Sequence, residues 1–131
     1  MDDVDDVFVA QVMSEELYTV SPDTLVEDAA RGMMDRGVGS VVVVDGDELA
    51  GILTSTDFVR IVAERQPKDR TPVSEYMSGD LVTTSPGAAI AEAAATMLEH
   101  GIHHLPVTDG DDGAVGVVST TDLAAYLSRV P

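Results

Sequence analysis

The chain has 131 residues, with 24 acidic and 7 basic side chains, and its formal net charge at pH 7 is −17. Polyanions need surfaces rich in Lys and Arg, so this charge excludes nucleic acid as the expected partner. The chain has no cysteine, no apolar stretch of the roughly 20 residues that span a bilayer, and no signal peptide in its first residues, MDDVDDVFVA. We therefore expect a cytoplasmic protein with one compact core, no disulfide and no membrane partner.

The first half of the chain predicts the element order strand, helix, strand, strand, helix. Residues 17–20 predict a short first strand. Thr24 is expected to be the N-cap of the following helix, with Glu27 completing a capping box, and Gly37 is expected just past the C-terminal end. Residues 41–54 form two apolar runs around an Asp-Gly turn, which predicts a β-hairpin, and the apolar spacing then becomes helical again.

The second half repeats the first. The segment GILTSTDF at residues 51–58 returns 65 residues further on as GVVSTTDL at 116–123. Residues 81–84 therefore predict the counterpart of the first strand. The segment between the halves is polar and contains two prolines and the only lysine, which predicts a surface linker. We expect an N-terminal extension over residues 1–11, a first motif over 12–64, a linker over 65–75 and a second motif over 76–131.

The repeated strand-to-helix corner has two interpretations. A Ser or Thr followed three residues later by an acid is what helix capping alone would select. Alternatively, the helix N-terminus binds a phosphate beside the hydroxyls of Thr54 and Thr56. Asp57 would then accept charge-assisted hydrogen bonds from the cis-diol of a ribose. A glycine precedes the hydroxyl by three residues in both copies, at Gly51 and Gly116. It is expected to let a ring or sugar approach the backbone.

Taken together, these motifs resemble the CBS domain family, as a tandem pair or Bateman module. The resemblance covers nearly all of residues 12–127 and rests on VMS at 12–14, YMS at 76–78, HGIHHLPVTD at 100–109 and the two corner segments. It implies an α+β fold of two pseudo-symmetric β-α-β-β-α motifs packed through their sheets into one CBS pair. It also implies that AMP, ADP or ATP, or less commonly S-adenosylmethionine, binds in clefts between the motifs, with no other cofactor required.

Carried over position by position, the resemblance implies two ligand-binding clefts, in which an acid would hold the ribose and apolar residues would hold adenine. Two histidines would lie toward the phosphates in the first cleft, whereas the second has no basic residue at the matching positions. The first cleft would comprise Thr54, Thr56, Asp57, Leu81, Val82, Ile102, His103, His104 and Pro106. The second would comprise Ser119, Thr121, Asp122, Leu17, Tyr18, Val38, Gly39 and Ser40.

The histidines also invite a metal-site interpretation, since His100 and His104 are four residues apart. Gly101 is expected to end the helix between them, so the shared helix face is lost and we predict no metal site. The acidic residues 109–113 lack the ligand pattern of a calcium loop. No catalytic motif of a hydrolase or P-loop enzyme is present, so we predict no catalytic residues.

We therefore predict a regulatory sensor of adenine nucleotides that acts on a separate effector protein and is not an enzyme. One rival is a dimerisation or scaffold module with vestigial clefts, which the missing base in the second cleft favours. Another is a small metallohydrolase built on the histidines. We also expect a homodimer, because apolar helix faces would otherwise stay uncovered. Those faces contain Phe58, Ile61, Val62, Leu123 and Leu127.

The composition of the charged residues indicates a protein of a halophilic archaeon. Asp outnumbers Glu by 16 to 8, and Lys68 is the only lysine. A net charge of −17 destabilises the compact state by self-repulsion. Salt at 1 M shortens the Debye length to about 3 Å, so concentrated salt would screen most of this repulsion.

Folding is therefore predicted to need salt. Moving the protein from molar potassium chloride into dilute buffer should lower its melting temperature steeply, because the carboxylates then repel one another unscreened. Circular dichroism melting curves over a salt series measure this effect. A melting temperature that does not change with salt would show that the acidity is an ordinary surface property.

Overall fold

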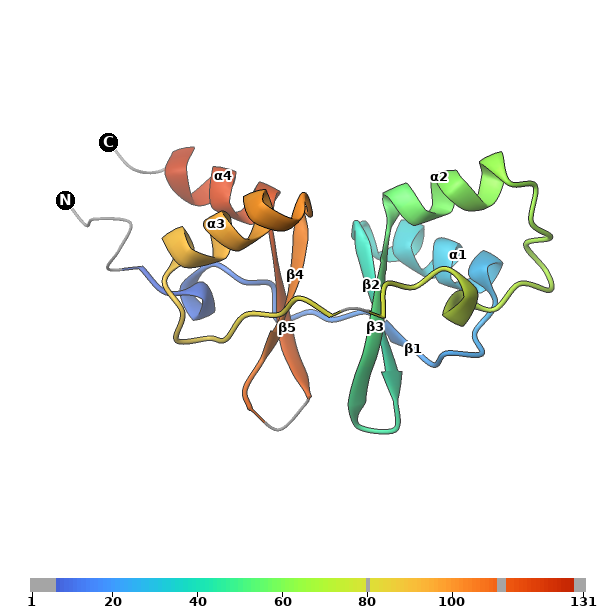
Figure 1. Cartoon of the computed structure of the whole chain (residues 1–131), viewed down its shortest axis with the longest axis horizontal. Helices are drawn as coiled ribbons and strands as arrows, with labels where there is room; N and C mark the ends of the chain where they lie inside the picture. The colour runs from blue at the N-terminus through green and yellow to red at the C-terminus, as the bar shows by residue number, and fades with distance from the viewer. Residues whose placement is uncertain (1–6, 80, 111–112, 129–131) are drawn as a thin grey trace. The chain divides into compact units, whose positions relative to one another are not determined.

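The structure is a computed structural model that describes residues 7–79, 81–110 and 113–128. The chain forms two compact units (Figure 1). Leu17–Leu81 make up the first, which we call the central unit. Met1–Glu16 and Val82–Pro131 together make up the second, which we call the terminal unit. Each unit holds one copy of the repeat, and the predicted α+β fold is confirmed.

The central unit is a three-stranded sheet with helices on one face (Figure 1). The strand order is β1-β2-β3, with β1 parallel and β3 antiparallel to β2. The predicted hairpin is confirmed, and Gly46 in its turn has a φ of 64°. The elements are β1 (Thr19–Val20), α1 (Val26–Arg36), β2 (Ser40–Asp45), β3 (Glu48–Thr54), α2 (Ser55–Ala63) and the 3-10 helix η3 (Val73–Glu75).

The terminal unit repeats this arrangement with a two-stranded antiparallel sheet. Its helices also lie on one face of the strand pair (Figure 1). The elements are the 3-10 helix η2 (Val9–Gln11), α3 (Ile90–His100), β4 (His104–Thr108), β5 (Ala114–Ser119) and α4 (Thr120–Ser128). None of the helices described in either unit is long and apolar enough to cross a membrane.

The strand predicted over residues 81–84 does not form, because Pro106 removes one of its hydrogen bonds. In the central unit the N–H of Val42 donates to the carbonyl of Tyr18 at 2.9 Å, which starts the parallel pairing of β1 with β2. Pro106 stands at the position of Val42 and has no N–H to donate. Among the described residues of the terminal unit, a single parallel bridge remains, Thr84 with Val107. The prediction for residues 81–84 was therefore wrong.

Each unit has its own hydrophobic core, and each core includes residues from the segment that leads into the other motif. Val73 and Tyr76 are buried in the central unit, and Val9 is buried in the terminal unit. Residues 64–70 are exposed as expected for a linker, but Thr71 and Val73 are buried. Val7 and Val9 are likewise buried, although they lie in the predicted N-terminal extension. The compact units and the repeats therefore divide the chain at different positions.

The two segments around residues 71–78 and 7–14, which we call the borrowed segments, also cap the first helix of each unit. The N–H of Val26 donates to the carbonyl of Thr71 at 2.9 Å, and the N–H of Ile90 donates to that of Val7 at 2.9 Å. The N-cap of α1 is Leu25, with no hydrogen bond from its side chain. The capping box predicted for Thr24 was therefore wrong, because backbone carbonyls already satisfy the free N–H groups at this helix end.

The two repeated glycines leave room for the backbone of another chain segment. The sequence pattern predicted that a ring or sugar would approach there. A Cβ on Gly51 would lie 2.9 Å from the carbonyl oxygen of Ser78, and one on Gly116 would lie 2.8 Å from that of Ser14. Ser78 bridges to Ile52, and Ser14 bridges to Val117, the residues that follow these glycines. The glycines are therefore explained by close packing of two chain segments.

Substituting either glycine should destabilise the fold. In Gly51→Ala and Gly116→Ala the added methyl would overlap a backbone oxygen, so each change should cost roughly 1–3 kcal/mol, as overpacking does. Gly87→Ala is the matched control, since a Cβ there meets no atom within 4 Å. Chemical denaturation at high salt measures the three free energies of unfolding. Equal stability of all three variants would contradict the proposed packing role.

Candidate functional site

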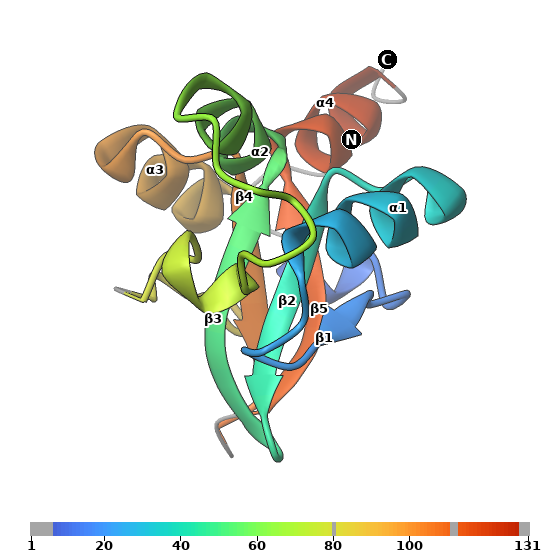
Figure 2. The same cartoon turned by 90° about the vertical axis from the view of Figure 1, so that its right-hand side faces the viewer.

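The corner of the central unit is a capped helix N-terminus, where β3 runs directly into α2 (Figure 2). The backbone N–H of Thr54, the N-cap residue, donates to Oδ2 of Asp57 at 2.9 Å, as in a capping box. The other carboxylate oxygen, Oδ1, lies 3.8 Å from Nη1 of Arg60. Thr56 is exposed on the first turn of α2. The capping interpretation of this corner is therefore confirmed.

The terminal unit builds the same corner. The N–H of Ser119 donates to Oδ2 of Asp122 at 2.8 Å, and the N–H of Asp122 donates to the Ser119 hydroxyl at 3.1 Å. Thr121 is exposed on the first turn of α4. Capping uses one oxygen of each carboxylate. The second oxygen of Asp122 makes no ion pair with the residues that the structure describes.

Strand register places the start of the second strand beside each corner. Ser40 pairs with Thr54 in the central unit, and His104 pairs with Ser119 in the terminal unit. The N–H of Thr120 also donates to the carbonyl of His103 at 3.0 Å. The structure therefore brings the two histidines together with Asp122, whereas the sequence grouped them with Asp57.

The other predicted site residues divide between the units in the same way. Leu17, Tyr18, Val38 and Gly39 belong to the central unit with Ser40, and Leu81 is its last residue. Val82, Ile102 and Pro106 belong to the terminal unit, where Pro106 is fully buried in β4. We call the first set the central edge and the second set, with the histidines, the terminal edge; each includes its own corner.

The structure perturbs the pKa of His104. Its Nδ1 is buried, with no hydrogen-bond partner in the part of the chain that the structure describes. Burial lowers the pKa of His104 below 6.5, the neighbouring His103 lowers it further, and the Asp122 carboxylate opposes the change. His104 is therefore neutral near pH 7. A nearby anion would favour its charged form and oppose this shift.

The structure also shows a cation at the central edge that the motif comparison missed. The guanidinium carbon of Arg36 lies 4.2 Å from the centroid of the Tyr18 ring, and Nη1 donates to the carbonyl of Gly32 at 3.3 Å. The Tyr18 ring in turn lies against α1 at Gly32, where a Cβ would overlap it. The central edge therefore contains a basic residue, although the motif positions themselves have none. Arg36 stands two residues before Val38, so only a search beyond the motif would have found it.

The histidines form no metal-binding group in the described part of the chain. Gly101 ends α3 in the left-handed conformation, with a φ of 64°, as expected. No cluster of three or more His, Asp or Glu side chains that could hold a metal occurs among the described residues. The acidic turn residues 111–112 lie outside the described residues.

Comparison with known proteins identifies relatives over nearly the whole chain. The sequence profile of the CBS domain matches residues 9–64 and 73–129. The CBS domain-containing protein YhcV of Bacillus subtilis is 35% identical, over 88% of this chain and 82% of that protein. The structure of a putative signal-transduction protein with CBS domains from Burkholderia ambifaria superposes with a TM-score of 0.87 at 33% identity, covering 95% of this chain and 97% of that one.

A third relative has been solved with ligands. The CBS domain pair of protein MJ0100, in complex with 5′-methylthioadenosine and S-adenosyl-L-methionine, has a TM-score of 0.85. It is 22% identical, and the match covers 93% of this chain and 96% of that one. At this identity the likeness establishes the shared fold.

Acid should destabilise the terminal unit through His104. Because the folded state lowers the pKa of His104, the unfolded chain binds its proton more readily, and stability is lost as pH falls below about 6.5. The melting temperature of His104→Gln should therefore fall less than that of the unmodified protein between pH 7.5 and 5.5. His103→Gln is the control, since that side chain is exposed. Parallel pH profiles for all three proteins would contradict this role.

Proposed function

Because this chain belongs to the CBS domain family, we propose that it is a regulatory module that binds an adenosine-type ligand and reports it to a separate effector protein. CBS domain proteins are generally regulatory, and the Burkholderia relative is described as a signal-transduction protein. The proposal gives the chain no catalytic step.

The repeated corner is the observation that carries the proposal. Each corner ends a hairpin at a helix N-terminus, where N–H groups and the helix dipole favour a phosphate. In each, the acid uses Oδ2 in capping, so Oδ1 would accept a hydrogen bond from a ribose hydroxyl; in Asp57 this oxygen also lies 3.8 Å from Nη1 of Arg60. Capping holds the carboxylate in place before any ligand arrives, which lowers the cost of ordering it.

We propose that ligand recognition uses both edges. At the central edge the residues are Leu17, Tyr18, Val38, Gly39, Ser40, Thr54, Thr56, Asp57 and Leu81. At the terminal edge they are Val82, Ile102, His103, His104, Pro106, Ser119, Thr121 and Asp122. Arg36 would give the central edge a positive charge, and the histidines would give the terminal edge hydrogen-bond donors.

The ligand class rests on the family and on this local chemistry. The MJ0100 pair, which has the same fold, was solved with two adenosine compounds that carry no phosphate. In this chain Arg36 contributes a cation at the central edge, and the imidazoles of His103 and His104 can donate hydrogen bonds at the terminal edge, which favours a phosphate-bearing ligand such as AMP, ADP or ATP over S-adenosylmethionine. Because the protein is strongly acidic and repels anions, a cation at the site matters more for attracting a phosphate than it would in a neutral protein.

Signalling would follow from differential affinity. A ligand that binds one conformation of the module more tightly than another shifts the population toward it, by an amount set by the ratio of the two affinities. An effector that recognises that conformation then binds more tightly when the ligand is present, and by linkage it also tightens ligand binding.

A scaffold or dimerisation module is the second candidate function. Exposed apolar side chains on the helices favour it, because soluble monomers rarely leave such patches uncovered. We propose that the chain forms a homodimer in either case. Nucleotide binding therefore separates the two functions, whereas the oligomeric state does not.

Calorimetric titration at high salt tests the proposed ligand. AMP should bind the unmodified protein, and Asp57→Asn and Asp122→Asn should each weaken one class of site by about ten- to a hundredfold, the effect of losing a charge-assisted hydrogen bond of roughly 1.5–3 kcal/mol. His103→Gln should weaken AMP but leave adenosine unchanged, because adenosine lacks the phosphate. If AMP, ADP, ATP, adenosine and S-adenosylmethionine all give no heat, the sensor function is refuted and the scaffold is favoured.

A further inference from the structure

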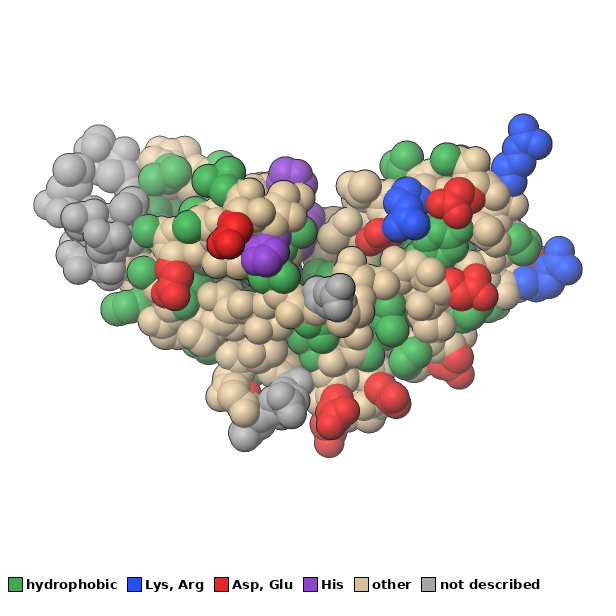
Figure 3. Space-filling model, in the orientation of Figure 1, with side chains coloured by type: hydrophobic (Ala, Val, Ile, Leu, Met, Phe, Trp, Pro, Cys, Tyr) green, Lys and Arg blue, Asp and Glu red, His purple; other side chains and the backbone are tan. Residues whose placement is uncertain are grey.

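A chain of contacts connects the corner of the central unit with the borrowed segment around residues 71–78. Asp57 and Arg60 lie on α2 and Glu64 is its C-cap, at spacings of three and four residues that place the three side chains on one face of the helix. On the face shown in Figure 3, basic and acidic side chains lie next to one another over α2. Tyr76 lies in the borrowed segment, at the end of η3. We call these four residues the α2 network.

Each neighbouring pair in the α2 network is in contact. Nη1 of Arg60 lies 3.8 Å from Oδ1 of Asp57, and its Nε lies 3.8 Å from Oε2 of Glu64. The Tyr76 hydroxyl donates to the other carboxylate oxygen of Glu64, Oε1, at 2.9 Å. The guanidinium carbon of Arg60 also lies 5.4 Å from the centroid of the Tyr76 ring, which is within the range of a cation–π contact. One arginine therefore joins the carboxylate of the corner to the borrowed segment.

Arg60 is shared between two carboxylates, and neither holds it firmly. Both N···O distances exceed the roughly 2.7–2.9 Å of a charge-assisted hydrogen bond, and 57% of the Arg60 side chain is exposed. Such pairs contribute little to stability, so exchanging one for the other costs little. The two ends of the network are more enclosed, since the side chain of Asp57 is 14% exposed and Tyr76 is 7% exposed. A change in how Arg60 is shared therefore affects groups that salt screens less.

Tyr76 belongs to a part of the borrowed segment that is fixed in the core. Its side chain packs in the core of the central unit, and the N–H of Ser78 donates to the carbonyl of Ile52 in β3 at 3.0 Å. Burial raises the pKa of Tyr76 above 10.0, and the hydrogen bond to Glu64 raises it further, whereas Arg60 lowers it. Tyr76 is therefore a neutral hydrogen-bond donor near pH 7, and its hydroxyl responds to the charge around Glu64.

The terminal unit has different residues at two positions of the network. The counterparts of Arg60 and Tyr76 are Ala125 and Val12, which have neither a charge nor a hydroxyl. The corner at Asp122 is capped in the same way as the corner of the central unit. It therefore provides a control in which the acid is present but the connecting residues are not.

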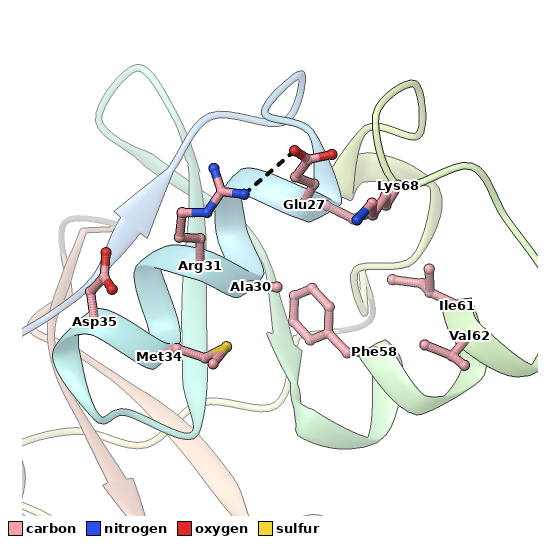
Figure 4. A pocket seen from close by; sticks show the side chains of 10 residues that line it. Glu27, Ala30, Arg31, Met34, Asp35, Phe58, Ile61, Val62 and Lys68 are labelled. Carbon is pink, nitrogen blue, oxygen red and sulfur yellow. Dashed lines mark ion pairs between the residues drawn. The ribbon is translucent and has the colours of Figure 1, made fainter.

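The α2 network lies apart from the apolar groove between α1 and α2. That groove has a volume of about 390 Å³, and Phe58, Ile61 and Val62 line it from the α2 side (Figure 4). Among the residues that the structure describes around this groove, none belongs to the α2 network. The network therefore connects the corner with the borrowed segment without using the apolar packing between the two helices.

We propose that Arg60 couples ligand binding at Asp57 to the borrowed segment. The inference rests on the proposed function and specifies how a signal leaves the central corner. A ribose hydroxyl that donates to Oδ1 of Asp57 replaces Arg60 at that oxygen, and the guanidinium then stays with Glu64 and Tyr76. Its closer approach offsets the charge of the Glu64 carboxylate and weakens the hydrogen bond that this carboxylate accepts from Tyr76. Occupancy of the corner thereby changes a contact of the segment that continues into the second motif.

Two substitutions should change ligand affinity in opposite directions. Arg60→Ala frees Oδ1 of Asp57 and should tighten adenosine binding about two- to fivefold, whereas Glu64→Gln leaves Arg60 to Asp57 alone and should weaken it by a similar factor. Adenosine is the probe because it has no phosphate for Arg60 to attract directly. Calorimetric titration at high salt, in the Asp122→Asn background, measures these affinities for the central corner. Arg31→Ala is the matched control, an exposed arginine of an ion pair within α1.

A ligand-free measurement tests the network itself. In protein made with tyrosine labelled with ¹³C at Cζ, the Tyr76 signal, assigned by Tyr76→Phe, reports the hydrogen bond of the hydroxyl. Asp57→Asn should move this signal in the unmodified chain and leave it unmoved in the Arg60→Ala chain, so the double-mutant cycle isolates coupling through Arg60. Arg60→Lys should retain part of the response. Saturating adenosine should also move the signal, and Asp122→Asn should not.

The inference is wrong if adenosine affinity falls in Arg60→Ala, because Arg60 would then support the corner or bind the ligand itself. It is equally wrong if Asp57→Asn moves the Tyr76 signal as far in the Arg60→Ala chain as in the unmodified chain. If neither adenosine nor AMP binds, the proposed function fails and this inference fails with it. If they bind and the Tyr76 signal stays unchanged, the inference alone is refuted.

Discussion

Backbone hydrogen bonds made by the two borrowed segments are the constraint on which the rest of this structure depends. The segment around Thr71–Ser78 caps α1 and pairs with β3, and the segment around Val7–Ser14 does the same for α3 and β5. In each place a buried backbone group finds its partner in a segment distant in sequence. Each motif is thereby tied to the segment that leads into the other motif, and neither half of the repeat is a complete unit.

These hydrogen bonds also determine where the small residues must be. The backbone of Ser78 or Ser14 can pair beside β3 or β5 only if the facing position has no side chain, and Gly51 and Gly116 meet this need. Three residues later the same strands end in the capped corners that present Asp57 and Asp122. Packing of the borrowed segments thus orients the strands whose ends form the proposed ligand-binding edges.

Duplication followed by divergence explains how two similar units acquire different roles. Both keep the corner, because helix capping alone is enough to retain a hydroxyl and an acid at this spacing. The polar groups of the two edges differ, since Arg36 stacks on Tyr18 in the central unit and His104 pairs with Ser119 in the terminal unit. Their helices diverge in the same way, since Arg60 on α2 has Ala125 as its counterpart on α4. One repeat can therefore supply two unlike surfaces.

The sequence by itself determined the repeat, the β-hairpins, the helix ends at Gly37 and Gly101 and the capped corners, because each depends on residues within a few positions of one another. Only the tertiary structure decided which segments complete each core, since a hydrogen bond from Val26 to Thr71 leaves no local pattern. It also decided that Pro106 prevents a strand at 81–84, and that His104 lies beside Ser119 and Arg36 over Tyr18. Those contacts join positions that are brought together by strand register and helix packing, which a local pattern does not specify.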